Sequence, residues 1–173
     1  MTDLITLTVR ELKKSTFAPY GDIIETNGAK SFFINQGTTE RFHDLAEVDV
    51  SDREGRPIIS IFRGRAFSLP IPIKMMERHP LGSQAFIPIT PYPWLLVVAP
   101  AEKDGTPGVP EAFLAGSHQG VSYRKGVWHH PLLSLQKTSD FLVVDRGGEG
   151  DNLEEFALPG SGYAIEALPH PHF

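Results

Sequence analysis

The chain has 173 residues and contains no cysteine, which excludes disulfide bonds, thiolate metal ligands and a cysteine nucleophile. Its length predicts a single domain spanning residues 1–173. The formal net charge is −5, and Lys and Arg do not form runs, which argues against a nucleic-acid-binding protein. The sequence has neither an apolar run long enough to cross a membrane nor a basic-then-apolar leader, so we expect a cytoplasmic location.

The first half of the chain alternates apolar and polar residues in short runs, a pattern typical of β-strands. Strands are expected at residues 4–9, 21–25, 32–35, 57–63 and 92–99. Residues 10–17 predict one or two helical turns, ending before a proline. The stretch 92–99 is the most continuously apolar, which predicts a strand buried in the core.

The second half continues the same pattern. Further strands are expected at residues 111–115, 119–123, 131–135, 140–145 and 162–166, and a short helix at 152–157. The last residues, with His170 and His172, are expected to form a flexible tail. Many short strands, frequent turns and little helix predict an all-β sandwich or barrel.

The chemistry of the chain concentrates in residues 77–88. Glu77 and His79 are two positions apart, so on a strand their side chains point to the same face. Residues 80–83 read as a turn, and Gln84 begins a new apolar strand. We therefore expect a hairpin that brings a carboxylate, an imidazole and an amide together in a metal or substrate site.

A further ligand is expected about forty-five residues later, where His129 and His130 follow a basic turn at 123–126. Adjacent strand residues face opposite sides of a sheet. Only one of these two histidines can therefore share a face with His79.

The pattern Glu77-x-His79-x4-Gln84, followed by Gly126-x-x-His129, resembles the two metal-binding motifs of the cupins. This resemblance implies a double-stranded β-helix, the jelly-roll barrel of that superfamily. It also implies a metal site formed by Glu77, His79, Gln84 and His129, with His130 as the alternative to His129. The chain departs from the usual cupin set, because Glu77 replaces a histidine and Gln84 replaces a glutamate.

Five blocks resemble the ureidoglycolate lyase family, formerly called ureidoglycolate hydrolases: residues 17–24, 40–45, 77–88, 126–132 and 140–148. The resemblance implies a carbon–nitrogen lyase of the amidine-lyase type. Such an enzyme cleaves (S)-ureidoglycolate to glyoxylate and urea in allantoin breakdown, part of purine degradation and nitrogen utilisation. It also implies a homodimer of cupin fold with a divalent metal cofactor, nickel above all.

Within this hypothesis the catalytic residues are Glu77, His79 and His130, with Glu77 serving as metal ligand or base. The residues expected to bind substrate are Gln84, Tyr123 and Arg63, the last through a bidentate contact to the substrate carboxylate.

Ordinary structural roles are expected for other polar and aromatic residues. Trp128 is expected to pack in the core, and Asp140 and Asp145 are expected to form buried ion pairs. Two other functions stay open: a ureidoglycolate amidohydrolase that releases ammonia, and a non-catalytic cupin that binds a small acid.

Overall fold

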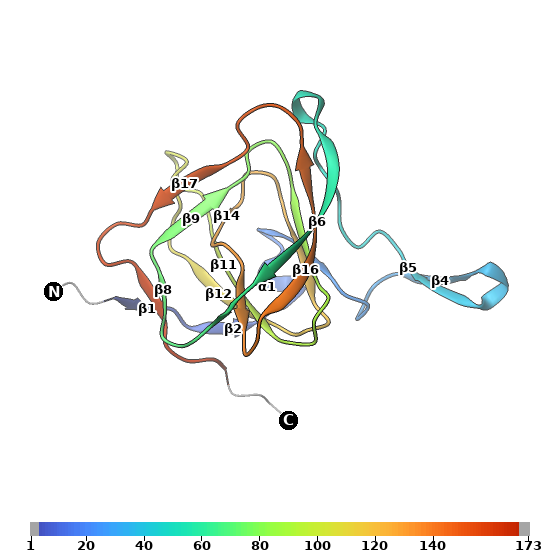
Figure 1. Cartoon of the computed structure of the whole chain (residues 1–173), viewed down its shortest axis with the longest axis horizontal. Coiled ribbons are helices and arrows are strands. Elements are labelled where there is room, and N and C mark those ends of the chain that lie inside the picture. Colours follow the sequence, from blue (N-terminus) through green and yellow to red (C-terminus); the bar gives the residue numbers. More distant parts are fainter. Residues whose placement is uncertain (1–3, 170–173) are drawn as a thin grey trace.

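The computed structural model describes residues 4–169, so the tail with His170 and His172 lies outside the described residues. Figure 1 shows a body of facing β-sheets from which one long hairpin projects. The all-β, cupin-like fold predicted from the sequence is confirmed. Within residues 4–169, however, the sheets do not close into the expected barrel, because they are separate and no ladder joins them into one cylinder.

The first sheet is antiparallel and has five strands in the order β3–β13–β10–β16–β6. Their bounds, in the same order, are Gly21–Ile24, Gly120–Tyr123, Gln84–Pro88, Ser139–Gly147 and Arg56–Gly64. In β16, Phe141 and Val143 point inward and are fully buried, while Asp140 and Leu142 alternate with them on the outer face.

The second and largest sheet has the order β17–β9–β14–β11–β12–β2, with β15 and β7 attached beside β11. The bounds are Glu154–Ala157, Met75–Arg78, Trp128–His129, Trp94–Ala99, Glu111–Ala115, Val9–Glu11, Leu133–Leu135 and Ala66–Phe67. The site described below is built mainly from β9 and β14, which are neighbours in this sheet.

Three smaller pieces complete the described chain. A three-stranded sheet joins β1 (Ile5–Thr6), β18 (Tyr163–Ile165) and β8 (Ile71–Ile73), and the projecting hairpin pairs β4 (Ser31–Ile34) with β5 (Thr39–Phe42). The helices are short: α1 (Lys14–Phe17), η1 (Asn35–Gly37) and η2 (Asp52–Glu54). Over residues 4–169, no helix is long and apolar enough to cross a membrane.

Strand β11 separates two apolar cores, which explains its continuous apolar sequence. Trp94, Leu96 and Val98 belong to the core against the five-stranded sheet, whereas Leu95 and Val97 belong to the core on the other side. Every residue of β11 is buried. The prediction that this stretch is a buried strand is therefore confirmed, and the buried Trp128 packs in a core as expected.

Two local predictions are wrong. Residues 77–88 do not form a hairpin, because β9 pairs with β14 and β17 while β10 pairs with β13 and β16. The turn after Arg78 instead carries the chain from one sheet to the other. The short helix expected at 152–157 is replaced by the strand β17, whose antiparallel pairing with β9 supplies backbone hydrogen bonds that one helical turn could not match.

Candidate metal centre

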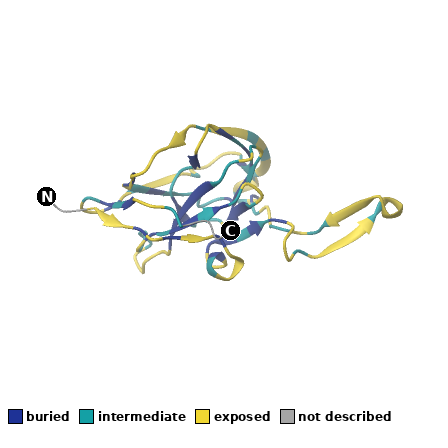
Figure 2. Cartoon of the chain, turned by 90° about the horizontal axis from the view of Figure 1, so that it is seen from below, coloured by how far each residue is buried: buried dark blue, intermediate teal, exposed yellow. Residues whose placement is uncertain are grey.

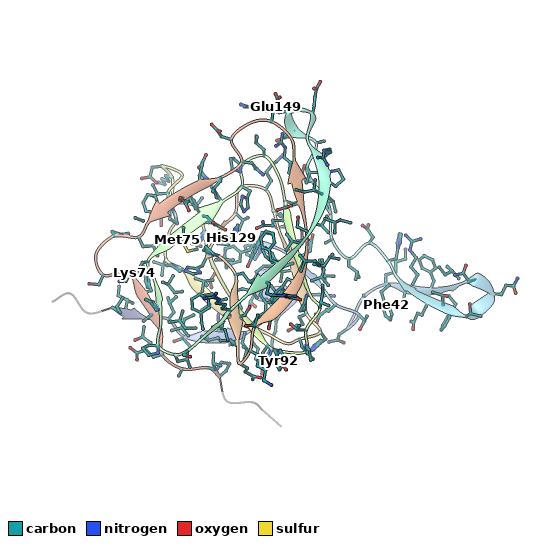
Figure 3. All side chains as sticks on the ribbon, in the orientation of Figure 1. Phe42, Lys74, Met75, Tyr92, His129 and Glu149 are labelled. Carbon is teal, nitrogen blue, oxygen red and sulfur yellow. The ribbon has the colours of Figure 1, made fainter. Side chains whose placement is uncertain are left out.

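Three potential metal ligands converge where the two large sheets meet. His129 in β14 lies directly opposite Glu77 in β9, and His79 follows one residue after β9 ends. One ligand atom of each of the three residues lies within 4.8 Å of those of the other two. Figure 3 shows His129 inside the body of the molecule, where only 2% of the residue is exposed. The cluster is therefore partly shielded from water.

Backbone carbonyls fix the orientation of both imidazoles. His79 Nδ1 donates to the carbonyl oxygen of Asn152 at 2.8 Å, and His129 Nδ1 donates to that of Val127 at 3.0 Å. A carbonyl oxygen only accepts hydrogen bonds, so each Nδ1 carries the proton. In its neutral form either ring then presents the lone pair of Nε2 to the cluster, which is how proteins orient metal-binding histidines.

A carboxylate fixes the amide of Gln84 in the same way. Its Nε2 donates to Asp145 Oδ2 at 3.1 Å, which leaves Gln84 Oε1 facing His79 Nε2, also at 3.1 Å. With a neutral His79 these two atoms are both acceptors. Two acceptors at hydrogen-bond distance are held together only by a positive charge between them, either a proton or a cation.

The same conflict occurs between His129 and Glu77. His129 Nε2 is buried, finds no hydrogen-bond partner among the described residues, and lies 3.5 Å from Glu77 Oε1. Ligands of one first-row divalent ion lie roughly 2.0–2.2 Å from it, and hence about 3–4 Å from one another. Imidazole nitrogen and carboxylate or amide oxygen suit nickel, zinc, iron or copper. The residues present therefore fit a divalent cation.

Electrostatics favour the charged form of Glu77. Burial acts to raise the pKa of this carboxyl, but the nearby imidazoles, His129 foremost and then His79 and His130, outweigh it and hold the pKa below its usual value. Burial lowers the pKa of His130, whose Nδ1 donates to the carbonyl oxygen of Pro131 at 2.9 Å. Glu77 is therefore an anion near neutral pH, as a metal ligand must be.

The sequence was compared with known proteins. The family model described as ureidoglycolate lyase matches residues 4–166. The chain belongs to the ureidoglycolate lyase family. A relative named ureidoglycolate lyase from Burkholderia mallei is 56% identical over 156 residues, which are 90% of this chain and 91% of the relative. A second of that name, from Brucella anthropi, is 55% identical over 161 residues, 93% and 95% of the two chains.

In this member of the ureidoglycolate lyase family, the four ligands expected from the sequence come together. Gln84 contacts His79, which stands beside His129, with their ring centres 5.2 Å apart. Tyr123, expected to bind substrate, is almost fully buried and stacks on the His129 ring at 4.3 Å. Burial and the charge of Glu77 raise its pKa, so the phenol stays protonated.

Two expected site residues lie outside the cluster of ligand atoms. His130 is the next residue after His129 and is not among the three grouped ligands. Arg63 lies in β6 opposite Asp140, and its guanidinium binds both carboxylate oxygens of Asp140, at 2.7 and 2.9 Å. Asp140 alternates with the buried Phe141, so this ion pair lies on the outer face of the five-stranded sheet, away from Gln84.

Two residues that support the site were not predicted in that role from the sequence. Asp145, expected in a buried ion pair, accepts a hydrogen bond from the Gln84 amide instead. Asn152 binds His79 through its carbonyl oxygen, and its side chain accepts from the backbone N–H of Leu81. Position 145 stands in a block that resembles the family, whereas nothing in the sequence marks Asn152.

Proposed function

We propose that this chain is a ureidoglycolate lyase, which splits (S)-ureidoglycolate into glyoxylate and urea. The observation that carries the proposal is the convergence of four acceptor atoms, on Glu77, His79, Gln84 and His129, in a chain of this family. The relatives of Burkholderia and Brucella bear the name of this activity.

The reaction transfers one proton from oxygen to nitrogen and breaks one carbon–nitrogen bond. In ureidoglycolate a single carbon carries a hydroxyl, a carboxylate and a ureido group. The hydroxyl loses its proton, the C–O bond becomes a carbonyl, and the C–N bond breaks with its electron pair going to nitrogen. That nitrogen then takes up a proton and leaves as urea. Water is not consumed, which distinguishes elimination from hydrolysis.

The residues of the chain supply the proton path and the orientation. A divalent cation bound here would lower the pKa of the substrate hydroxyl and hold it in place. Glu77, whose carboxylate is ionised, would take the hydroxyl proton, and His130, when its imidazole is protonated, would deliver a proton to the departing nitrogen. The proton on Glu77 would then return through solvent to His130, so that the cycle closes with no net change in protons. Gln84 and Tyr123 would shape the site around the substrate.

Finer features rest on the resemblance and are part of the proposal. Nickel is the cation that the family resemblance implies, and imidazole ligands suit it. The resemblance likewise implies a homodimer and a place in allantoin degradation. The cytoplasmic location and the single domain remain predictions from the sequence.

A product assay tests the activity. Purified protein supplied with nickel is incubated with ureidoglycolate, and glyoxylate, urea and ammonia are followed against the spontaneous rate. We expect enzyme-dependent glyoxylate with equimolar urea and no ammonia. Ammonia in place of urea would establish an amidohydrolase, and a rate equal to background with every divalent metal tried would favour a binding protein.

A further inference from the structure

The projecting hairpin formed by residues 30–42, called the arm below, pairs with no other strand of the described residues 4–169. β4 and β5 are hydrogen-bonded to each other in a two-stranded sheet of their own. Figures 1 and 2 show the arm standing away from the body, almost entirely exposed. Eleven of its thirteen residues are exposed. An isolated two-stranded hairpin is marginally stable in water, so something is expected to cover this one.

Both faces of the arm carry aromatic residues. Phe33 is 67% exposed and lies opposite Glu40 on one face. Phe32 is 39% exposed on the other face, where it lies against the side chains of Arg41 and His43. Aromatic side chains bury a large area when covered and are enriched at protein–protein interfaces. The arm therefore has the composition of a contact element.

A matching apolar surface lies on the outer face of the five-stranded sheet. The outer patch consists of Ile59 and Ile61 in β6, Leu142 and Val144 in β16, and Ile87 in β10. Ile61, Leu142 and Ile87 form one row across three strands, and Ile59 and Val144 begin the next. Ile59 is 72% exposed and Ile61 is 54% exposed. The solvent face of an antiparallel sheet is normally polar, so this patch is also expected to be covered.

The geometry favours a second copy of the chain as the partner. The arm points away from the body, so it does not cover the patch of its own chain (Figure 1). If two copies are related by two-fold symmetry, the arm of each chain can lie on the patch of the other, and such a contact would be closed and self-complementary. Eleven exposed arm residues and five patch residues then enter the interface from each side. With their flanks they approach the roughly 20–30 residues a side of a stable interface, which neither surface reaches alone.

We propose that two copies of this chain exchange their arms, each arm lying across the outer patch of the partner through Phe32 and Phe33. This inference specifies the interface of the homodimer proposed above. It is independent of the lyase activity, because neither surface contains a residue of the metal centre.

The mass of the protein in solution tests the exchange. We expect the wild-type chain to have twice its 19.1 kDa chain mass in light scattering or native mass spectrometry. Phe33→Asp in the arm and Ile61→Asp in the patch should each weaken dimerisation at least about tenfold, since each places a charge in an apolar contact. Matched controls are Val109→Asp, at a site 67% exposed, and Leu153→Asp, at a site 53% exposed. Both controls should stay dimeric.

Cross-linking provides a second measurement that does not depend on variants being stable as monomers. Since the chain lacks cysteine, a Phe33→Cys protein and an Ile61→Cys protein can be mixed and joined with a short bismaleimide. We expect a cross-linked dimer from the mixture and none when Val109→Cys replaces Ile61→Cys. A monomeric wild-type protein, a dimer unaffected by both Asp substitutions, or equal cross-linking to position 109 would overturn the proposal. Because these readouts need no turnover, an inactive but dimeric protein would contradict only the proposed function.

Discussion

The four acceptors of the candidate metal centre are held by different parts of the chain. His129 sits within a strand and stacks on Tyr123, whereas His79 lies just beyond the end of β9 and is held by the Asn152 carbonyl. The side-chain amide of Gln84 in β10 is oriented by its hydrogen bond to the carboxylate of Asp145 in β16. Single substitutions can therefore separate ligands from the residues that orient them.

Removal of either imidazole should abolish metal binding and turnover. We expect His79→Ala and His129→Ala to lower kcat/KM by at least about 100-fold. Even the loss of a residue that only orients a metal ligand commonly lowers metal affinity or activity by about 10–100-fold. Nickel titration calorimetry and the product assay measure both effects. The exposed His118, replaced by Ala, is the control. Turnover near wild type in a folded His79 or His129 variant would exclude that residue as a ligand.

Asp145 should act on the metal through Gln84. In Asp145→Asn the new side chain can offer an amide N–H, so the Gln84 amide is no longer forced to point its oxygen at His79. We expect nickel affinity to fall about 10–100-fold with little change in thermal stability of the metal-free protein. Asp140→Asn, on the outer face of the same strand, is the matched control. An unchanged dissociation constant would show that Gln84 is oriented without Asp145.

The position of Arg63 predicts that it does not touch substrate. Arg63→Gln should leave KM within about twofold of wild type, because the pair with Asp140 is solvent-exposed. A clear rise in KM with unchanged kcat would restore the role suggested by the sequence.

The guanidinium of Arg63 also holds the pKa of Asp140 below its usual value. Any stability from this pair is therefore present above the ordinary Asp pKa, about 3.9, and is lost as the pH falls through the folded-state value.

At the scale of elements, β3 can lie close beside β13 because residue 21 is a glycine and has no side chain. A Cβ added at Gly21 would lie 1.9 Å from the carbonyl oxygen of Ser122. We expect Gly21→Ala to lower the free energy of unfolding by about 1–3 kcal/mol, since neither strand can move without disturbing the sheet. Urea denaturation measures this loss, with Asp22→Ala on the same strand as the control. Equal stability of the Gly21 variant and wild type would contradict the close approach.

Local patterns predicted most strands but not their partners. The apolar stretches at 57–63, 92–99 and 140–145 were predicted correctly as strands. The strand at 92–99 is buried on both faces and the one at 140–145 on one face, whereas no residue of 57–63 is buried. The β9–β10 hairpin was predicted wrongly, because the turn sequence specifies a change of direction and not the sheet that receives the next strand. Residues 152–157 carry no strong local signal, so pairing with β9 decided their structure.

In the candidate site, too, features set by local sequence were predicted, and those set by contacts between distant residues were not. The spacing of Glu77 and His79 predicted a shared face, and the paired histidines supplied the next ligand. Asp145 and Asn152 were not recognised, because their contribution depends on contacts between positions 61 and 73 residues apart in the chain. Arg63 was placed at the site because guanidinium binds carboxylates. The sequence did not reveal that a carboxylate of its own sheet already holds it.

For the whole molecule, metal binding should couple to stability. A ligand that binds only the folded state at about 100 times its dissociation constant adds about 2.7 kcal/mol. Nickel should therefore raise the Tm of the wild-type protein, and should not raise that of His129→Ala. The increase should shrink as the pH falls, because the ligands must be a neutral imidazole and an ionised carboxylate. Equal shifts in the two proteins would show that nickel binds elsewhere.

The double burial of β11 also sets the order in which the molecule opens. Its backbone amides are covered by an apolar core on each side, so their hydrogen exchange should require global unfolding. The metal centre is attached to this slowest part, since His129 pairs with Val98 and the His130 N–H binds the Val97 carbonyl oxygen. β17 lies at the edge of the same sheet and should exchange first. The candidate ligand His129 would then keep its place during the fluctuations that loosen the rim.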